Sequence, residues 1–68
     1  MIQFYIELKG KLNSEELWER VKVCNGVNVL DLEKQIWCYG KVTKPLFLQV
    51  VMACLEFTDH INVEVTVH

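Results

Sequence analysis

The sequence predicts one small α+β domain in which two helices cover a single face of a four-stranded sheet. Apolar residues alternate with period two in four short segments, which is typical of strands, and recur with helical spacing in two others. In chain order the six segments read strand, helix, strand, strand, helix, strand. All of them lie within residues 1–68, a length typical of one domain.

The first strand and the first helix have clear boundaries. Residues 2–8 alternate between apolar and polar side chains and end at a glycine. A helix over residues 14–24 follows, with Asn13 as its N-cap and Glu16 at the position of a capping-box acid. The dipeptide Asn25-Gly26 then supplies a left-handed stop.

The second half of the chain predicts a hairpin, a helix and a last strand. Residues 27–32 and 36–42 predict two strands joined by the polar turn Glu33-Lys34-Gln35. A second helix then begins near Pro45, because the first turn of a helix does not need the missing amide, and runs to about residue 57. Residues 61–67 alternate again and predict the final strand.

This order is the split β-α-β pattern of ferredoxin-like folds. Because β-α-β crossovers are right-handed, it predicts an antiparallel sheet in the order 4-1-3-2, with both helices on one face and the other face open. The side chains expected to face the helices are Ile2, Phe4, Ile6, Leu8, Ile36, Cys38, Ile61, Val63, Val65 and Val67.

Composition limits the classes of protein to consider. The apolar fraction of 51% suffices for a core without metal or disulfides, and the net charge of −2 gives no basic footprint for nucleic acid. Three cysteines, an odd number at low density, favour reduced thiols in the cytosol. Residues 45–55 are about half the length that spans a bilayer, and no secretory leader is recognisable, so we expect a cytoplasmic location without membrane contact.

The open face of the sheet is the first candidate binding surface. Tyr5 on the first strand and Trp37 and Tyr39 on the third point to this side, and these strands are neighbours in the predicted order. We expect Val29, with Val27, to extend the cluster on the second strand, whose leucines would then be buried. Tyrosine and tryptophan favour protein interfaces, although aromatic pairs across strands also simply stabilise an exposed sheet.

RNA-recognition motifs stack bases on aromatic side chains at this position. The glycine- and aromatic-rich signature of their third strand is absent from residues 35–41. Acidic side chains on this face would also repel phosphates, so we favour a protein ligand over nucleic acid. The charged residues assigned to the face are Glu7, Asp31, Glu64, Lys9 and Lys41.

The second helix is the other candidate surface, because its polar arc is narrower than a surface helix normally has. Leu48, Met52 and Leu55 lie toward its outer side. They either pack against the first helix or are covered by a second copy of the chain, and we favour a homodimer.

No catalytic or metal-binding motif is present in the sequence. Cys24, Cys38 and Cys54 fall on inward positions, where the pKa of a thiol rises, and their separations give no support for a site at which they converge. His60 lies in a turn, and the glycines are isolated rather than gathered in a phosphate-binding loop. We therefore expect no enzyme activity and no cofactor.

From Gly26 onward the chain resembles heavy-metal-associated domains. The similar segments are Gly26-Val27, Asp31-Leu32-Glu33-Lys34-Gln35 and Gly40-Lys41-Val42-Thr43-Lys44-Pro45-Leu46. That family binds its metal through two cysteines in the loop after the first strand, whereas residues 10–14 contain none here. The resemblance therefore implies the ferredoxin-like fold and a metal-free relative that binds protein.

Together these features predict a non-enzymatic interaction module that binds a protein partner or a second copy of itself. It would act as a complex subunit, a small regulator or a phage-type inhibitor. Two other functions stay open: a carrier of a soft metal or small ligand, and a binder of single-stranded nucleic acid. Folds of the same strand order also include small-molecule-sensing regulatory domains that pair edge to edge.

Overall fold

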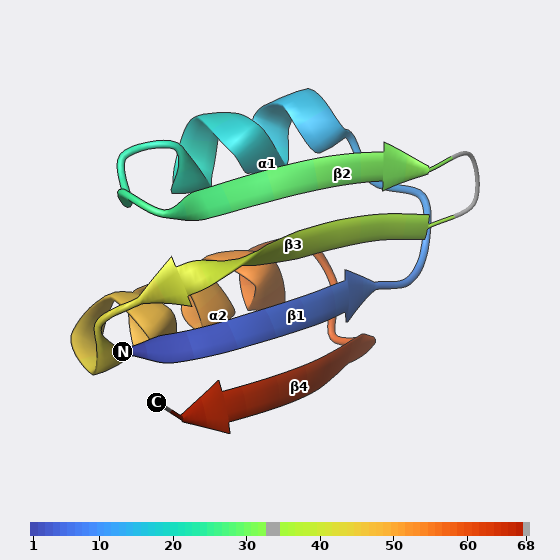
Figure 1. Cartoon of the computed structure of the whole chain (residues 1–68). Coiled ribbons are helices and arrows are strands. Elements are labelled where there is room, and N and C mark those ends of the chain that lie inside the picture. Colours follow the sequence, from blue (N-terminus) through green and yellow to red (C-terminus); the bar gives the residue numbers. More distant parts are fainter. Residues whose placement is uncertain (33–34, 68) are drawn as a thin grey trace.

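The computed structural model describes residues 1–32 and 35–67. The chain forms four strands and two helices in the predicted order (Figure 1). In chain order they are β1 (Ile2–Leu8), α1 (Ser14–Val21), β2 (Val27–Leu32), β3 (Gln35–Val42), α2 (Lys44–Phe57) and β4 (Ile61–Val67).

The strands form one antiparallel sheet in the order β2-β3-β1-β4, with the helices on one face (Figure 1). This is the predicted order 4-1-3-2 read from the opposite edge, so the ferredoxin-like β-α-β-β-α-β sandwich is confirmed. Strands β1 and β3 occupy the centre of the sheet and β2 and β4 its edges. Side chains on the central strands are therefore held by neighbours on both sides.

The core lies between the two central strands and the helices. Phe4, Ile6 and Cys38 are completely buried, as are Leu17 of α1 and Cys54 of α2. The ring of Phe4 lies 5.4 Å from that of Phe47 on α2, in a tilted arrangement favourable for aromatic pairs. Packing around Phe4 thus joins α2 to β1.

Helix α1 begins as predicted and ends earlier. The side-chain oxygen of Asn13 accepts hydrogen bonds from the backbone amides of Glu15 and Glu16, which confirms the N-cap. The helix ends at Val21 instead of residue 24. The next residues turn so that Cys24 reaches the core and the chain enters β2.

Close contact between β2 and β3 explains the glycine at the start of β2. Gly26 has φ +94°, and a Cβ atom there would lie 2.5 Å from the carbonyl oxygen of Lys41. Gln35, predicted to lie in the turn, is the first residue of β3 and pairs with Leu32. The other predicted turn residues, Glu33 and Lys34, and the C-terminal His68 lie outside the described residues.

Strand β4 contributes less to the core than β1 and β3 do. Val63, Val65 and Val67 pair with buried β1 residues and lie on the helix side of the sheet, as expected. These valines are nevertheless 40%, 45% and 75% exposed, so a position on the helix side of the sheet does not bury them. Helix α2 packs on β1 and α1, and although Ile61 at the start of β4 packs against the core, the helix side of β4 from Val63 onward stays exposed.

Candidate functional site

The three predicted aromatic residues come together on the open face. Tyr5 of β1 is directly opposite Tyr39 of β3, and their rings stack with centroids 6.0 Å apart and planes 13° from parallel. Trp37 lies two residues from Tyr39 along β3, on the same face. Because these residues belong to central strands, hydrogen bonds on both sides fix their positions.

Strand β2 contributes leucines to this face instead of the predicted valine. Leu30 pairs directly with Trp37, so both side chains point to the open face, whereas Val29 points to the helix side and packs against the core. Val27 is buried as well. The prediction that Val27 and Val29 extend the aromatic cluster was therefore wrong, because pairing Leu32 with Gln35 sets the opposite register.

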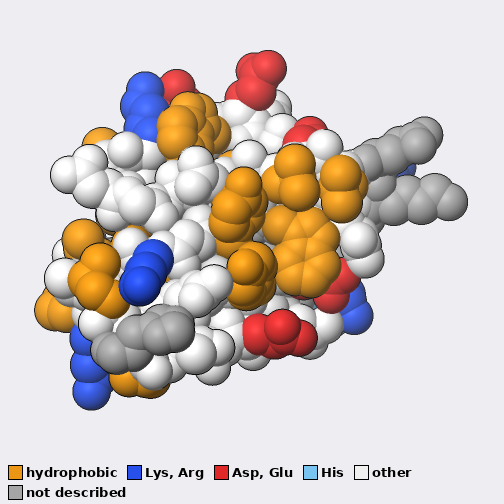
Figure 2. All heavy atoms as spheres, in the orientation of Figure 1, with side chains coloured by type: hydrophobic (Ala, Val, Ile, Leu, Met, Phe, Trp, Pro, Cys, Tyr) orange, Lys and Arg blue, Asp and Glu red, His pale blue; other side chains and the backbone are white. Residues whose placement is uncertain are grey.

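Together these side chains form a continuous apolar surface. Hydrophobic side chains gather over one half of the open face, and acidic groups border them (Figure 2). Five residues line a shallow depression of about 300 Å³ within this group. We call them the open-face patch: Tyr5, Leu30, Leu32, Trp37 and Tyr39.

Two carboxylates lie beside this patch. Glu7 is opposite Trp37 across the β1–β3 pair, and Glu64 is opposite Tyr5 across the β1–β4 pair. The carboxylate of Glu7 accepts hydrogen bonds from the side-chain amides of Gln35 and Asn62, which hold it at the surface. The patch is therefore apolar with an acidic border.

Asp31, predicted to lie on the open face, has a different position. It lies on the helix side of β2, and its carboxylate accepts a hydrogen bond of 2.6 Å from the Ser14 hydroxyl. The assignment of Asp31 to the open face was wrong, because the register that exposes Leu30 also turns Asp31 toward α1. Lys41 lies on the open face opposite Gln3.

The predicted residues of α2 lie at the surface and do not pack beneath α1. Leu48, Met52 and Leu55 are all exposed. Leu48 and Met52 line a shallow groove between the two helices, together with Val23. The Arg20–Glu56 ion pair bridges the helices beside this groove.

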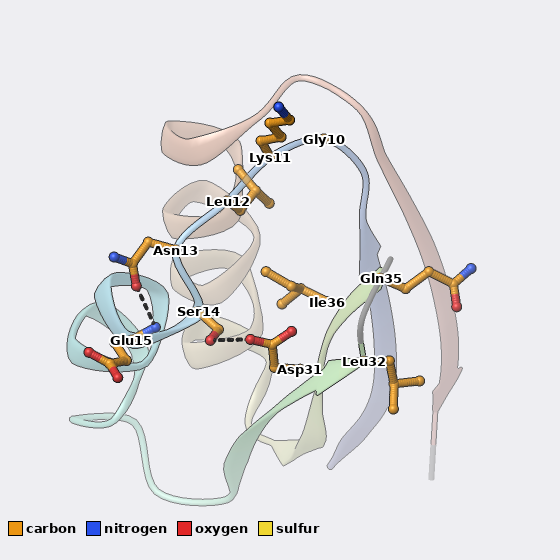
Figure 3. Close-up of a pocket in the computed structure, with 10 residues that line it drawn as sticks. All are labelled: Gly10, Lys11, Leu12, Asn13, Ser14, Glu15, Asp31, Leu32, Gln35 and Ile36. Carbon is orange, nitrogen blue, oxygen red and sulfur yellow. Dashed lines mark hydrogen bonds between the residues drawn. The ribbon is translucent and has the colours of Figure 1, made fainter.

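A cleft lies where the β1–α1 connection meets the turn end of the β2–β3 hairpin (Figure 3). In the heavy-metal-associated domains the connection after the first strand carries the metal. Here Asn13 caps α1 and Ser14 is bonded to Asp31, while Leu32 and Gln35 point away from the cleft (Figure 3). Asn13, Ser14 and Asp31 thus stabilise the fold at this cleft.

The buried thiols of Cys38 and Cys54 lie within hydrogen-bonding reach, although their sequence spacing gave no sign of this. The hydrogen bond with Cys54 and burial together raise the pKa of Cys38. Cys24 is also buried, and all three thiols are free. A neutral, inaccessible thiol is a poor nucleophile, so Cys38 serves as a core residue.

Metal coordination finds no support in residues 1–32 and 35–67, where no group of three His, Cys, Asp or Glu side chains is placed to hold an ion. Helix α2 has 14 residues, and no helix in the described part of the chain reaches the length and apolarity needed to cross a bilayer. Comparison with family models, curated proteins and solved structures finds no match to this chain.

The aromatic residues of the patch were thus predictable from alternation, but Leu30 and Leu32 were not. One parity of β2 carries Val27 and Val29 and the other carries Leu30 and Leu32, so alternation alone does not show which pair faces outward. The length of the hairpin turn decides which set faces outward, and the sequence left that length open.

Proposed function

We propose that this protein is a non-enzymatic binding module that holds another protein through the open-face patch. The observation that carries the proposal is an apolar depression that spans the central strands β1 and β3 and the edge strand β2, on the face of the sheet opposite the helices. Tyrosine and tryptophan anchors in such a depression are the residues most often responsible for binding energy at interfaces. The stacking of Tyr5 on Tyr39 also stabilises the sheet, but it does not account for the exposed Leu30 and Leu32 beside the half-buried Trp37.

The border of the patch indicates the chemistry of the partner. Glu7 and Glu64 flank the aromatic side chains, so a partner segment that combines apolar side chains with arginine or lysine fits best. A guanidinium group there has both a carboxylate and an aromatic ring within reach. The same carboxylates oppose a phosphate backbone, which makes single-stranded nucleic acid the weaker candidate.

A peptide-display selection on the immobilised protein tests this proposal. The selected peptides should share apolar residues flanked by basic ones, and their binding should quench tryptophan fluorescence. Trp37→Ala and Leu30→Ala should each weaken binding by at least tenfold, as expected for central anchors. Val23→Ala is the matched control, since Val23 is exposed and lies at the groove between α1 and α2, on the opposite side of the sheet from the patch.

Two results would contradict the proposal. One is the recovery of no peptide, or of peptides that bind Trp37→Ala and Leu30→Ala as well as the parent protein. The other is tighter binding of an oligonucleotide, with an affinity that falls steeply as salt rises, which would identify a nucleic-acid binder instead. Circular dichroism of each variant separates lost binding from lost folding.

A further inference from the structure

Among the described strands, β4 is an edge strand with one unpaired side. It pairs with β1 on one side, and no strand of residues 1–32 and 35–67 lies on its other side. Its helix-side residues Val63, Val65 and Val67 are exposed, although their β1 partners are buried. An edge strand with an exposed apolar face of this kind is a template for another strand.

The direction of the backbone groups on β4 follows from one hydrogen bond. The amide of Lys9 donates to the carbonyl of His60. Because hydrogen-bonded pairs alternate along an antiparallel ladder, every second residue of β4 counted from His60 directs its amide and carbonyl groups toward β1. These residues are Asn62, Glu64 and Thr66. Val63, Val65 and Val67 therefore direct their amide and carbonyl groups outward. The outward backbone groups and the exposed valines belong to the same residues.

The other edge of the sheet is protected by charge. On β2 the corresponding outward-facing residues are Val27, Val29 and Asp31, because the amide of Lys41 donates to the carbonyl of Gly26. Helix α1 lies beside this edge, and the groove between them is lined by Glu15, Glu19 and Asp31. Two copies brought together here would place carboxylates against carboxylates. Strand β4 carries one acidic residue, Glu64, and its side chain lies on the open face.

We propose that β4 pairs antiparallel with β4 of a second copy of this chain, which makes a closed two-fold dimer with one continuous sheet. This inference is independent of the function proposed for the open-face patch. The occupant is a second copy because the edge is complementary to itself. In such an antiparallel pair, the valines of one β4 lie opposite valines of the other β4. The valines of both copies then lie on the helix side of the continuous sheet.

The charge of Glu64 selects the register. A two-fold axis at Glu64 would place this carboxylate opposite its own copy, which is unfavourable. An axis at Val65 instead places Glu64 opposite the partner's Thr66 and Val63 opposite the partner's Val67. This register covers Val67, the most exposed of the three valines, whereas an axis at Val63 leaves it unpaired. Among axes at Val63, Glu64 and Val65, the geometry therefore points to Val65.

Helix α2 places apolar side chains beside this interface. Gln49, Ala53 and Glu56 face the groove toward α1, so helical spacing places Phe47, Val51 and Leu55 on the side toward β4. Phe47 contacts Phe4, which is the β1 partner of Val65. A second copy at the edge therefore extends the core that Phe4 and Phe47 begin.

Sedimentation equilibrium over a range of concentrations tests the dimer. The parent protein should be dimeric, and Val65→Lys should weaken the dimer by about a hundredfold, since it opposes two like charges at the axis. The matched control is Val23→Lys, the same change at a side chain that is 78% exposed beside the α1–α2 groove; it should leave the dimer unchanged. A parent protein that stays monomeric at about 1 mM, or a dimer broken by Val23→Lys and kept by Val65→Lys, overturns the proposal.

The register has its own test. Thr66→Lys places an ammonium group opposite the partner's Glu64 and should tighten the dimer by about two- to fivefold. A dimer that Thr66→Lys leaves unchanged or weakens excludes the axis at Val65. Folding of each variant is checked by circular dichroism, and Thr66, Val65 and Val23 are all exposed in the single chain, so these changes leave its core intact.

Discussion

Two side chains that face each other across neighbouring strands should differ sharply in their contribution to stability. Phe4 on β1 and Val65 on β4 are direct partners on the helix side of the sheet. Phe4 is completely buried and contacts Phe47, whereas Val65 is 45% exposed. Replacing each by alanine therefore measures how much of this face the helices cover.

The expected effects follow from burial. Phe4→Ala removes a fully buried ring and should lower the free energy of unfolding by about 3–5 kcal/mol. Val65→Ala removes two half-exposed methyl groups and should cost less than about 1 kcal/mol in the monomer. A domain of 68 residues is stable by about 3–10 kcal/mol, so the first change comes close to unfolding it.

Urea unfolding followed by circular dichroism measures both changes. The experiment is run at about 1 µM protein, where a weak dimer would contribute little to stability. If Phe4→Ala does not fold, Phe4→Leu replaces it, with an expected loss of about 1–2 kcal/mol. A loss for Val65→Ala equal to that for Phe4→Ala would show that α2 covers β4, and it would refute this account of the uncovered edge.

Two further predictions concern the hairpin and the thiols. Gly26→Ala should lower the free energy of unfolding by about 2–3 kcal/mol, because it combines a positive φ with a Cβ atom 2.5 Å from the Lys41 carbonyl oxygen. Gly10→Ala, where φ is also positive but a Cβ atom would meet only the Thr58 hydroxyl at 4.0 Å, should cost about 1–2 kcal/mol, and equal losses would contradict the close contact. Stability should also fall as pH rises above 9.0, the ordinary pKa of the thiol, because the unfolded chain then releases the Cys38 proton that the folded chain retains. Cys38→Val should make this fall shallower in denaturant titrations at several pH values, and an unchanged slope would assign it to other groups.

The hairpin shows where prediction from the sequence stopped. Alternation on β1 and β3 placed Tyr5, Trp37 and Tyr39 on one face, because the residues that alternate with them along the same strands are apolar and belong to the core face. On β2 both parities carry aliphatic residues, so the pattern was equally consistent with Val29 or Leu30 facing outward. Pairing of Leu30 with Trp37 decided the matter. Register is a property of two strands together and cannot be read from one of them.

The open face illustrates what the sequence determined and what the tertiary structure decided. Local patterns of alternation, capping and helical spacing determined the order of the elements, and the right-handed crossover then determined the sheet and its exposed aromatic side chains. The lateral position of α2 was not contained in those patterns. It depends on how Phe4, Phe47 and the α1–α2 contacts pack together, and it leaves Val63, Val65 and Val67 at the surface. Periodicity tells which face a side chain is on, but only packing between layers decides whether that face is covered.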